Sequence, residues 1–231
     1  MMGKLALMNE KLRVVGGLTR HDARNKLAVI TGNVFLAKKK LTANHEALTY
    51  LKEIETAVRQ IEGIFDFAKT YEMLGVEKLV YMDVEKTVEE AVSLFPDMHG
   101  VKIVNVCHGL TVRADSLLRQ FFYNLIDNSL KHGKKVSQIR IYYEETAENQ
   151  LRLAYEDDGV GVPIEEKEKI FSEDYRGDTN HGLFLMWRIC EVYGWSIRET
   201  GKPDKGAQFA IVIPKLNENM KTNYRIDHTA P

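Results

Sequence analysis

Three polar side chains recur at helical spacing inside an apolar segment. Asn124, Asn128 and Lys131 stand at positions i, i+4 and i+7 of residues 115–132, a segment that is otherwise rich in leucine, isoleucine and phenylalanine. On a helix these three lie within about 60° of one another and form a narrow polar stripe. Two amide oxygens and one ammonium group suit a hard cation with its attached phosphates, because magnesium takes oxygen ligands. The alternative is that the asparagines bond only to neighbouring backbone.

A carboxylate and two glycines follow an apolar run. Asp157-Asp158-Gly159-Val160-Gly161 comes directly after residues 151–155, whose composition is typical of a strand. An aspartate at a strand end can accept a hydrogen bond from an exocyclic amine, and glycines let backbone approach a ligand closely. An ordinary strand-to-loop turn also accounts for the motif, so it indicates little when taken alone.

Two further glycines stand near expected element boundaries. His181-Gly182-Leu183 opens a helical segment after Ile170-Phe171 and a polar stretch, residues 174–180. A glycine at a helix start leaves N–H groups for phosphate oxygens, and the polar stretch could close over a nucleotide. The alternative is a surface loop with no role. The run Lys205-Gly206-Ala207-Gln208-Phe209 reads in isolation as a hairpin turn.

The order of these motifs argues against coincidence. Five motifs follow one another between residues 83 and 214: Asn-x3-Asn-x2-Lys, DxGxG, Ile-Phe, Gly-Leu and Gly-Ala-x-Phe. This succession resembles the ATP-binding domain of histidine kinases and their relatives in the GHKL superfamily, which includes gyrase and Hsp90. The resemblance implies ATP and Mg²⁺ as cofactors. The residues that it places at the nucleotide are Asn124, Asn128, Lys131, His132, Asp157, Gly159, Gly161, His181, Gly182 and Leu183.

The resemblance also implies individual roles at this site. Asp157 would read the adenine amine, Asn124 and Asn128 would hold magnesium, and Lys131 would contact phosphate. The departures from the family pattern lie in the second glycine box, usually GxGLGL, which here retains only Gly182. The asparagine that usually follows the adenine aspartate is replaced by Asp158.

A histidine motif near the N-terminus selects one branch of this superfamily. The run Arg20-His21-Asp22-Ala23-Arg24-Asn25-Lys26-Leu27 resembles the phosphoacceptor box HDxxNxL of histidine kinases, and gyrase-like relatives lack it. By this resemblance His21 accepts the phosphoryl group, Asp22 acts as a base, and Asn25 positions a water that removes phosphate from a partner. A histidine has a reference pKa of about 6.5, so neutral imidazole is available near pH 7.

The elements that must position these residues form two regions. Residues 1–75 contain no proline, and apolar residues recur there at three- and four-residue steps on both sides of Thr42-Ala43-Asn44. This pattern predicts a helical hairpin, whose broad apolar stripe favours pairing with a second copy as a dimeric four-helix bundle.

The pattern of the second region, residues 76–215, predicts an α+β fold, and the resemblance implies the α/β sandwich of the GHKL type. Residues 216–231 are expected to be a disordered tail. Strands are predicted at residues 79–82, 101–106, 138–143, 151–156, 196–199 and 208–213, and helices at residues 84–95, 115–132 and 182–193.

Composition excludes several classes of protein. The chain has 32 basic and 33 acidic residues, a net charge of −1, so no global field attracts nucleic acid or an anionic membrane. No stretch approaches the roughly 18 apolar residues of a membrane span. The two cysteines, Cys107 and Cys190, have no zinc-ligand spacing, and a cytoplasmic location is expected.

The leading functional hypothesis is ATP-dependent autophosphorylation of His21 followed by transfer to an aspartate in the receiver domain of a response regulator. One alternative is a degenerate kinase that acts as a dimeric scaffold or a response-regulator phosphatase. Another is a GHKL ATPase or an anti-sigma-type serine kinase, which leaves the His21 motif without a role.

Overall fold

The computed structural model describes residues 2–41, 45–146, 150–172, 181–216 and 221–227. They divide into two compact units, and the division falls between Glu72 and Met73. The sequence predicts this boundary between residues 75 and 76, a few residues further along the chain.

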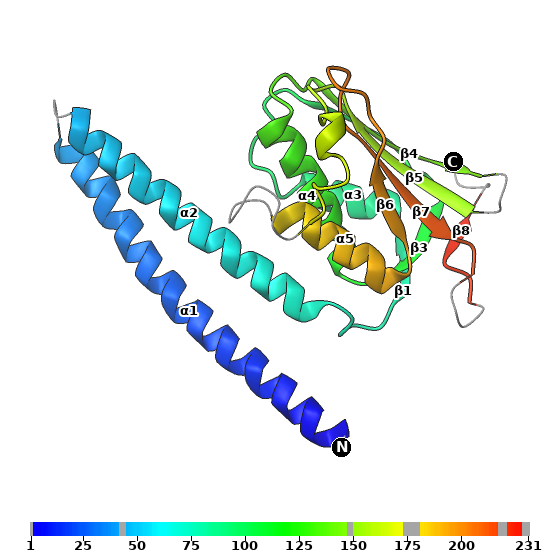
Figure 1. Cartoon of the computed structure of the whole chain (residues 1–231), viewed down its shortest axis with the longest axis horizontal. Coiled ribbons are helices and arrows are strands. Elements are labelled where there is room, and N and C mark those ends of the chain that lie inside the picture. The colour runs from blue at the N-terminus through cyan, green and yellow to red at the C-terminus, as the bar shows by residue number, and fades with distance from the viewer. Residues whose placement is uncertain (1, 42–44, 147–149, 173–180, 217–220, 228–231) are drawn as a thin grey trace. The chain divides into compact units, whose positions relative to one another are not determined.

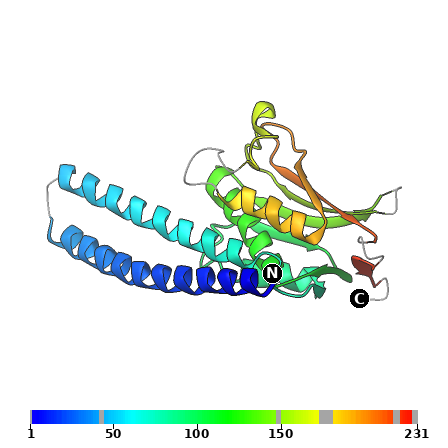
Figure 2. The ribbon, with the colours of Figure 1, turned by 60° about the horizontal axis from the view of Figure 1, so that its bottom comes forward.

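The first unit is a hairpin of two long antiparallel helices that lie side by side (Figures 1 and 2). Helix α1 spans Met2–Lys40 and α2 spans His45–Met73. The turn predicted at residues 42–44 lies outside the described residues. Lysines 38, 39 and 40 form the last turn of α1, where positive charge complements the helix dipole. No helix in the described part of the chain is both long and apolar enough to cross a membrane.

The hairpin leaves much of its apolar stripe uncovered. Leu27, Val34 and Val58 are buried between the helices. Many other large apolar side chains are exposed on the two helices: Val29, Ile30, Phe35, Leu36, Tyr50, Ile54, Ile61, Ile64 and Tyr71. Two helices offer each other only one contact face, so a stripe this broad needs a further surface to bury it.

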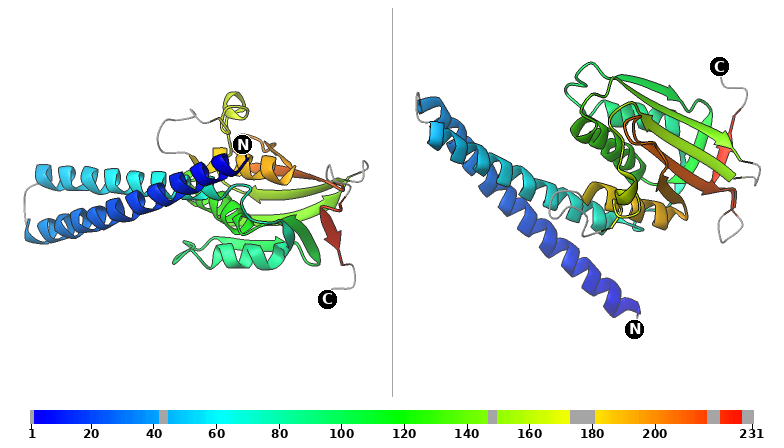
Figure 3. Two further views of the ribbon diagram at one scale, coloured as in Figure 1. Left: turned by 90° about the horizontal axis from the view of Figure 1, so that it is seen from below. Right: turned by 45° about the horizontal axis from the view of Figure 1, so that its top comes forward.

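Within its described residues, the second unit contains three α-helices and two sheets. Its elements are drawn in Figures 1 and 3. Its helices are α3 (Val84–Val92), α4 (Leu117–His132) and α5 (His181–Tyr193), with a short 3₁₀ turn at Ile164–Glu166. Its strands are β1 (Val80–Asp83), β2 (Lys102–Val106), β3 (Leu110–Ala114), β4 (Gln138–Glu145), β5 (Gln150–Asp157), β6 (Ser196–Glu199), β7 (Gln208–Pro214) and β8 (Tyr224–Ile226).

The larger sheet has the strand order β2-β4-β5-β7-β6, and all neighbours are antiparallel except the parallel pair β2 and β4. Its side chains alternate between a buried and an exposed face. Helices α3, α4 and α5 lie on one face only (Figure 3). The buried face carries Ile139, Ile141, Leu151, Leu153, Tyr155, Ile197, Phe209, Ile211 and Ile213. The predicted α+β class with helices on one face of a sheet is confirmed.

The smaller sheet, β1-β3-β8, includes two strands that the sequence does not predict. Strand β8 pairs with β3, so the expectation of a disordered tail is wrong for residues 224–226. Asn223, just before β8, accepts a hydrogen bond from the Arg113 amide at 2.7 Å and donates to the Pro214 carbonyl at 3.0 Å. Three residues are too few to show a period in the sequence; β8 forms because the open edge of β3 offers hydrogen bonds.

Because the ring of Tyr224 is buried, we expect β8 to stabilise the second unit. Tyr224 is 4% exposed. We expect Tyr224→Ala to lower the free energy of unfolding by about 3 kcal/mol, since large-to-small changes leave a cavity. Urea unfolding followed by tryptophan fluorescence measures this, because Trp187 and Trp195 both lie in the second unit.

Arg225→Ala is the matched control for this prediction. The Arg225 side chain is exposed and lies 3.8 Å from the centre of the Tyr81 ring. Its removal is expected to cost about 1 kcal/mol or less. Equal losses in the two variants would show that burial of Tyr224 is not what holds β8 in place.

Candidate functional site

Asp157 is the centre of the polar cluster in the second unit. This residue ends β5, and only 8% of it is exposed. Oδ1 accepts hydrogen bonds from the backbone amides of Gly159 at 2.9 Å and Ala207 at 3.0 Å. Oδ2 accepts a bond from the Ser129 hydroxyl at 2.6 Å. Donors from α4, from the loop after β5 and from the turn before β7 therefore hold one carboxylate.

A buried tyrosine extends this network. The Tyr155 hydroxyl lies 2.9 Å from Ser129 Oγ. Burial raises the pKa of Tyr155 well above its ordinary value, with a smaller contribution from the charge of Asp157, against the lowering effect of the Ser129 hydrogen bond. The phenol therefore stays protonated and can donate to Ser129, while Ser129 donates to Asp157.

The Asp157 carboxylate keeps room for one more donor. A carboxylate offers about four lone-pair positions, and the three donors above use three of them. One exocyclic amine can occupy the fourth. Ser129 and Ala207 are site residues that the sequence analysis misses. The signal for Ser129 is a hydroxyl on the buried stripe of α4, three residues after the apolar Ile126.

The glycines around Asp157 permit close approaches between backbone segments. Gly206 has φ +98°, and a Cβ there would lie 1.7 Å from the Asp157 carbonyl oxygen. Gly161 has φ +70°, and its Cβ would lie 2.7 Å from the Gly206 carbonyl. A Cβ on Gly159 would lie 2.7 Å from the carbonyl of Gly133. The sequence analysis assigns Gly159 and Gly161 to ligand approach; the structure shows that each packs against other backbone of the same unit.

The two asparagines of α4 carry unsatisfied polar atoms. Asn124 Oδ1 accepts a bond from Gln120 at 3.1 Å, while the Nδ2 atoms of Asn124 and Asn128 are buried with no protein partner. A Cβ on Gly182 would lie 3.9 Å from Asn124 Cγ, so the start of α5 lies beside these amides. Lys131 is instead exposed and pairs with Asp127 at 2.7 Å.

This arrangement fits a nucleotide with its metal ion. Unpaired buried amides require partners, and phosphate oxygens or a cation supply them when the side-chain amides take the suitable orientation. The described residues contain no cluster of three histidine, cysteine or acidic side chains that could hold a metal alone. Magnesium takes oxygen ligands and usually binds together with the phosphates of its substrate, so the amide oxygens of Asn124 and Asn128 fit Mg²⁺ that arrives with ATP.

The remaining predicted nucleotide residues are less informative. His132 lies exposed in the last turn of α4. His181 begins α5, but its side chain and the predicted polar stretch 174–180 lie outside what the structure describes. Leu183 is 6% exposed, so its side chain packs in the core, and only its backbone remains available to a ligand.

Asp158 has a structural role in the loop before β4. Its carboxylate accepts bonds from the Ser137 amide and hydroxyl and from the Gln138 amide. Partial burial opposes the charged form, but the hydrogen bonds from Ser137 and Gln138 outweigh it and lower the pKa of Asp158. The replacement of the family's usual asparagine thus provides an anionic acceptor for three donors.

The first unit presents a different kind of site. His21 lies on α1 with its side chain 72% exposed, and Nδ1 lies 3.3 Å from Asp22 Oδ1. A carboxylate at Nδ1 favours the tautomer with the proton on that nitrogen, which leaves the lone pair of Nε2 for reaction. Asn25 is exposed one turn further along α1. The structure brings these three residues together on one accessible part of the helix.

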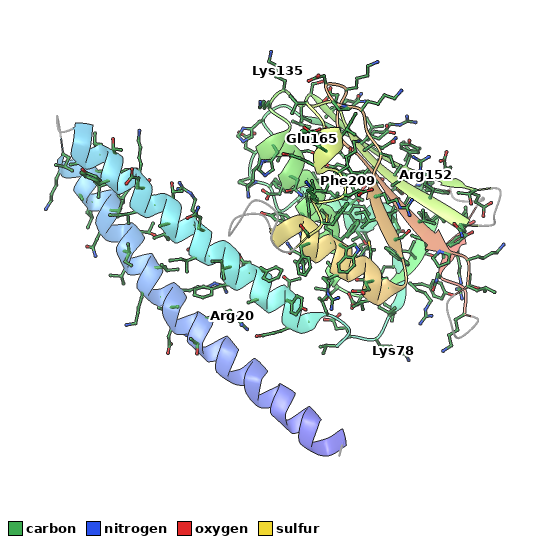
Figure 4. All side chains as sticks on the ribbon, viewed as in Figure 1. Arg20, Lys78, Lys135, Arg152, Glu165 and Phe209 are labelled. Carbon is green, nitrogen blue, oxygen red and sulfur yellow. The ribbon has the colours of Figure 1, made fainter. Side chains whose placement is uncertain are left out.

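Two ion pairs between α1 and α2 flank His21. Arg20, labelled in Figure 4, donates from Nη1 and Nη2 to the two oxygens of Glu72 at 2.8 and 2.6 Å. Arg24, one turn later, donates to Asp66 at 2.6 Å. Both arginines face α2, and adjacent helix positions differ by about 100°. The pairs therefore fix the rotation of α1 that keeps His21 exposed.

Comparison with known proteins finds histidine kinases and related ATPases. Residues 114–217 match the family model of histidine kinase-, DNA gyrase B- and HSP90-like ATPases. Over 89% of its length the chain is 26% identical to the signal transduction histidine-protein kinase AtoS of Escherichia coli K12, of which it covers 36%. Over 44% of its length it is 30% identical to the adaptive-response sensory kinase SasA of Prochlorococcus marinus strain MIT 9303, of which it covers 30%. Residues 114–217 are therefore similar to the ATPase domain of these proteins, and most of the chain is similar to histidine kinases.

Solved structures of histidine kinases share the fold. Full-length ShkA in complex with AMPPNP matches 92% of this chain and 46% of that one, with a TM-score of 0.63 and 19% identity. The catalytic domain of the histidine kinase ThkA matches 60% of this chain and 97% of that one, with a TM-score of 0.52 and 24% identity. The chain spans between 30% and 36% of the length of the two curated relatives named above.

The approach of Gly206 to Asp157 gives a stability prediction. Gly206→Ala is expected to lower the free energy of unfolding by about 3 kcal/mol or more, because the Cβ meets both a left-handed φ and a backbone oxygen. Gly194→Ala is the matched control: its φ is +71°, but no atom lies within 4 Å of its Cβ. We expect the control to lose only about 1 to 2 kcal/mol in urea unfolding. A smaller loss for Gly206→Ala than for the control would contradict the close packing.

The lowered pKa of Asp158 gives a pH prediction. Its folded-state pKa lies below the unfolded value of about 4, so the stabilisation is complete above that pH and is lost as the pH falls through the folded pKa. Asp158→Asn should therefore make the urea midpoint less dependent on pH between about pH 5 and pH 2. Parallel midpoint curves for the variant and the parent would contradict the assigned hydrogen bonds.

Proposed function

We propose that this chain is an autophosphorylating protein histidine kinase that transfers the phosphoryl group of ATP to His21 and then to an aspartate of a response regulator. The observation that carries the proposal is the combination of an exposed histidine oriented by Asp22 with a second unit whose central carboxylate has one free acceptor position. Neither feature alone defines a kinase, but together they supply a phosphoryl acceptor and a nucleotide reader.

Nucleotide binding would use the polar atoms around α4. The free acceptor position of Asp157 would take a hydrogen bond from the exocyclic amine of adenine. Asn124 and Asn128 would hold Mg²⁺, which neutralises phosphate charge when it is bound. The first amides of α5, beginning at Gly182, would donate to phosphate oxygens. Lys131 would reach phosphate after leaving Asp127, since both partners lie at the surface end of α4.

Phosphoryl transfer would begin at Nε2 of His21. The lone pair of Nε2 attacks the γ-phosphorus of ATP, and the bond between that phosphorus and the β,γ-bridging oxygen breaks, so that ADP leaves. The imidazole becomes positively charged as the new N–P bond forms, and Asp22 accepts the Nδ1 proton. Because such reactions depend mainly on alignment and charge neutralisation, the exposed position of His21 matters as much as its reactivity.

The partners in this proposal are a second copy of the chain and a receiver domain. The exposed apolar side chains of the hairpin, among them Ile54, Ile61 and Ile64, favour a homodimeric four-helix bundle. The phosphohistidine would pass its phosphoryl group to a receiver aspartate, which attacks phosphorus while Nε2 departs. Removal of phosphate from that aspartate by a water bound at Asn25 would be the reverse regulatory activity.

A second candidate is a degenerate kinase that acts as a scaffold or response-regulator phosphatase. The observation that favours it is the second glycine box, which keeps only Gly182 and has the bulky Phe184 where the family has glycine. Asn25 is also exposed and available. Calorimetry with ATP, with and without Mg²⁺, separates the candidates, because a scaffold needs no nucleotide.

Substitution of His21 tests the proposed acceptor. His21→Gln is expected to abolish incorporation of γ-labelled phosphate, because the amide lacks a nucleophilic ring nitrogen, while ATP binding by calorimetry persists. His99→Asn is the matched control, since His99 is also an exposed histidine whose Nδ1 lies beside an aspartate, at 3.1 Å from Asp97. It should label like the parent.

Three outcomes would contradict this proposal. Undiminished labelling of His21→Gln would remove the assigned acceptor. A label that survives acid would indicate a serine kinase, since phosphohistidine is acid-labile. Binding of ATP without any label in the parent would favour the degenerate kinase.

A further inference from the structure

A buried ion pair joins Lys167, in the segment after the glycine motif, to Glu199 at the end of β6. Lys167 Nζ contacts Glu199 Oε2 and the carbonyl oxygen of Gly201. The Glu199 side chain is 0% exposed and that of Lys167 is 18% exposed. An ionised carboxylate at such depth is costly unless a cation and hydrogen bonds satisfy it.

Glu199 organises the turn between β6 and β7. Its second oxygen, Oε1, accepts hydrogen bonds from the backbone amides of Gly201 and Gln208, both at 3.0 Å. These bonds bring the two ends of residues 200–208 together. A Cβ on Gly201 would lie 2.6 Å from Glu199 Oε1, so the backbone wraps closely around the carboxylate.

The same turn supplies a donor to the nucleotide site. Ala207, next to Gln208, donates from its amide to Asp157 Oδ1 at 3.0 Å and accepts from the Asp157 amide at 2.9 Å. The turn also approaches the first glycine motif, where Asp204 donates from its amide to the Val160 carbonyl at 2.8 Å. Lys167 is thus linked to Asp157 by a chain of contacts: Lys167 pairs with Glu199, Glu199 accepts from the Gln208 amide, and the neighbouring Ala207 amide donates to Asp157.

Lys167 belongs to a stem, residues 163–172, that follows the glycine motif and packs on the helix-covered face of the large sheet. Ile170 of the stem is 2% exposed. Phe171 meets Phe209 edge to face with ring centres 6.3 Å apart, and Phe209 lies 6.3 Å from the Tyr155 ring. Figure 4 labels Glu165 on this stem and Phe209 on β7. Strand register places Phe209 between Glu199 and Tyr155.

We propose that Lys167 and Glu199 are positioning residues: their buried ion pair fixes the turn at residues 200–208 and, through Ala207, the orientation in which Asp157 receives an adenine amine. The inference rests on the proposed binding of ATP at Asp157. It predicts that loss of the pair changes the discrimination between purine bases, because adenine has an exocyclic amine at the position where guanine has a carbonyl oxygen.

The test compares ATP and GTP affinities by calorimetry, with Mg²⁺ and the full chain. Lys167→Met is expected to weaken ATP binding about tenfold while GTP binding changes less than about twofold, since a displaced Asp157 loses only the base-specific bond. Lys167→Arg retains the charge and should stay within about threefold of the parent.

A double variant separates charge pairing from packing. Lys167→Met leaves a buried carboxylate unpaired, whereas Lys167→Met combined with Glu199→Gln removes the charge and keeps acceptors for Gly201 and Gln208. The double variant should therefore recover most of the ATP affinity and the thermal midpoint that the single variant loses. Arg152→Met is the matched control, since it breaks an exposed pair with Glu144 at the far end of β5 from Asp157.

Hydrogen exchange of the 200–208 peptide gives a readout that needs no nucleotide. We expect faster exchange there in Lys167→Met and unchanged exchange in Arg152→Met. Unchanged exchange and an unchanged ratio of ATP to GTP affinity in Lys167→Met would overturn the inference while leaving the proposed function intact. A parent that binds no ATP would overturn the proposed function, and with it the link to base recognition. If Lys167→Met does not fold, the double variant and Lys167→Arg decide the question.

Discussion

The buried carboxylate of Asp157 joins three segments of the second unit. Asp157 accepts hydrogen bonds from Ser129 of α4, from Gly159 of its own loop and from Ala207 of the turn before β7. A charged group this deep is tolerated only because these donors are present, so the three segments must converge at one point. The same convergence leaves one acceptor position unused. One set of hydrogen bonds therefore holds the three segments together and leaves an acceptor position on Asp157 for a further donor.

The two units meet opposite physical requirements. The proposed nucleotide site at Asp157 needs burial, because hydrogen bonds discriminate best where water is excluded and unpaired groups are costly. The proposed phosphoryl acceptor needs exposure, because Nε2 of His21 would have to reach a nucleotide and then a receiver domain. The hairpin provides this exposure by directing Arg20 and Arg24 toward α2, which turns His21 outward. The ion pairs between the two helices thereby keep His21 exposed.

The glycine motifs in the sequence indicate where backbone is closely approached, but not which group approaches it. The pattern of Gly159 and Gly161 after Asp157 indicates close approach of backbone, and close approach is what the structure contains. The pattern does not distinguish a ligand from the chain itself as the approaching group. Gly206 is even less informative in the sequence, since it looks like an ordinary turn residue, yet its Cβ would overlap the carbonyl of Asp157. Contacts between segments far apart in sequence leave no local pattern.

Local patterns were enough to predict the helical hairpin, most of the large sheet and the positions of His21, Asn124 and Asp157 on their elements, because periodicity and motif order are properties of short stretches of chain. The partners that satisfy those residues became known only from the folded molecule. Folding used Asp158 to hold Ser137, added β8 to the edge of β3 and buried Glu199 against Lys167. The physical reason is that hydrogen bonds and ion pairs across the fold depend on distance and burial, which spacing along the chain does not encode.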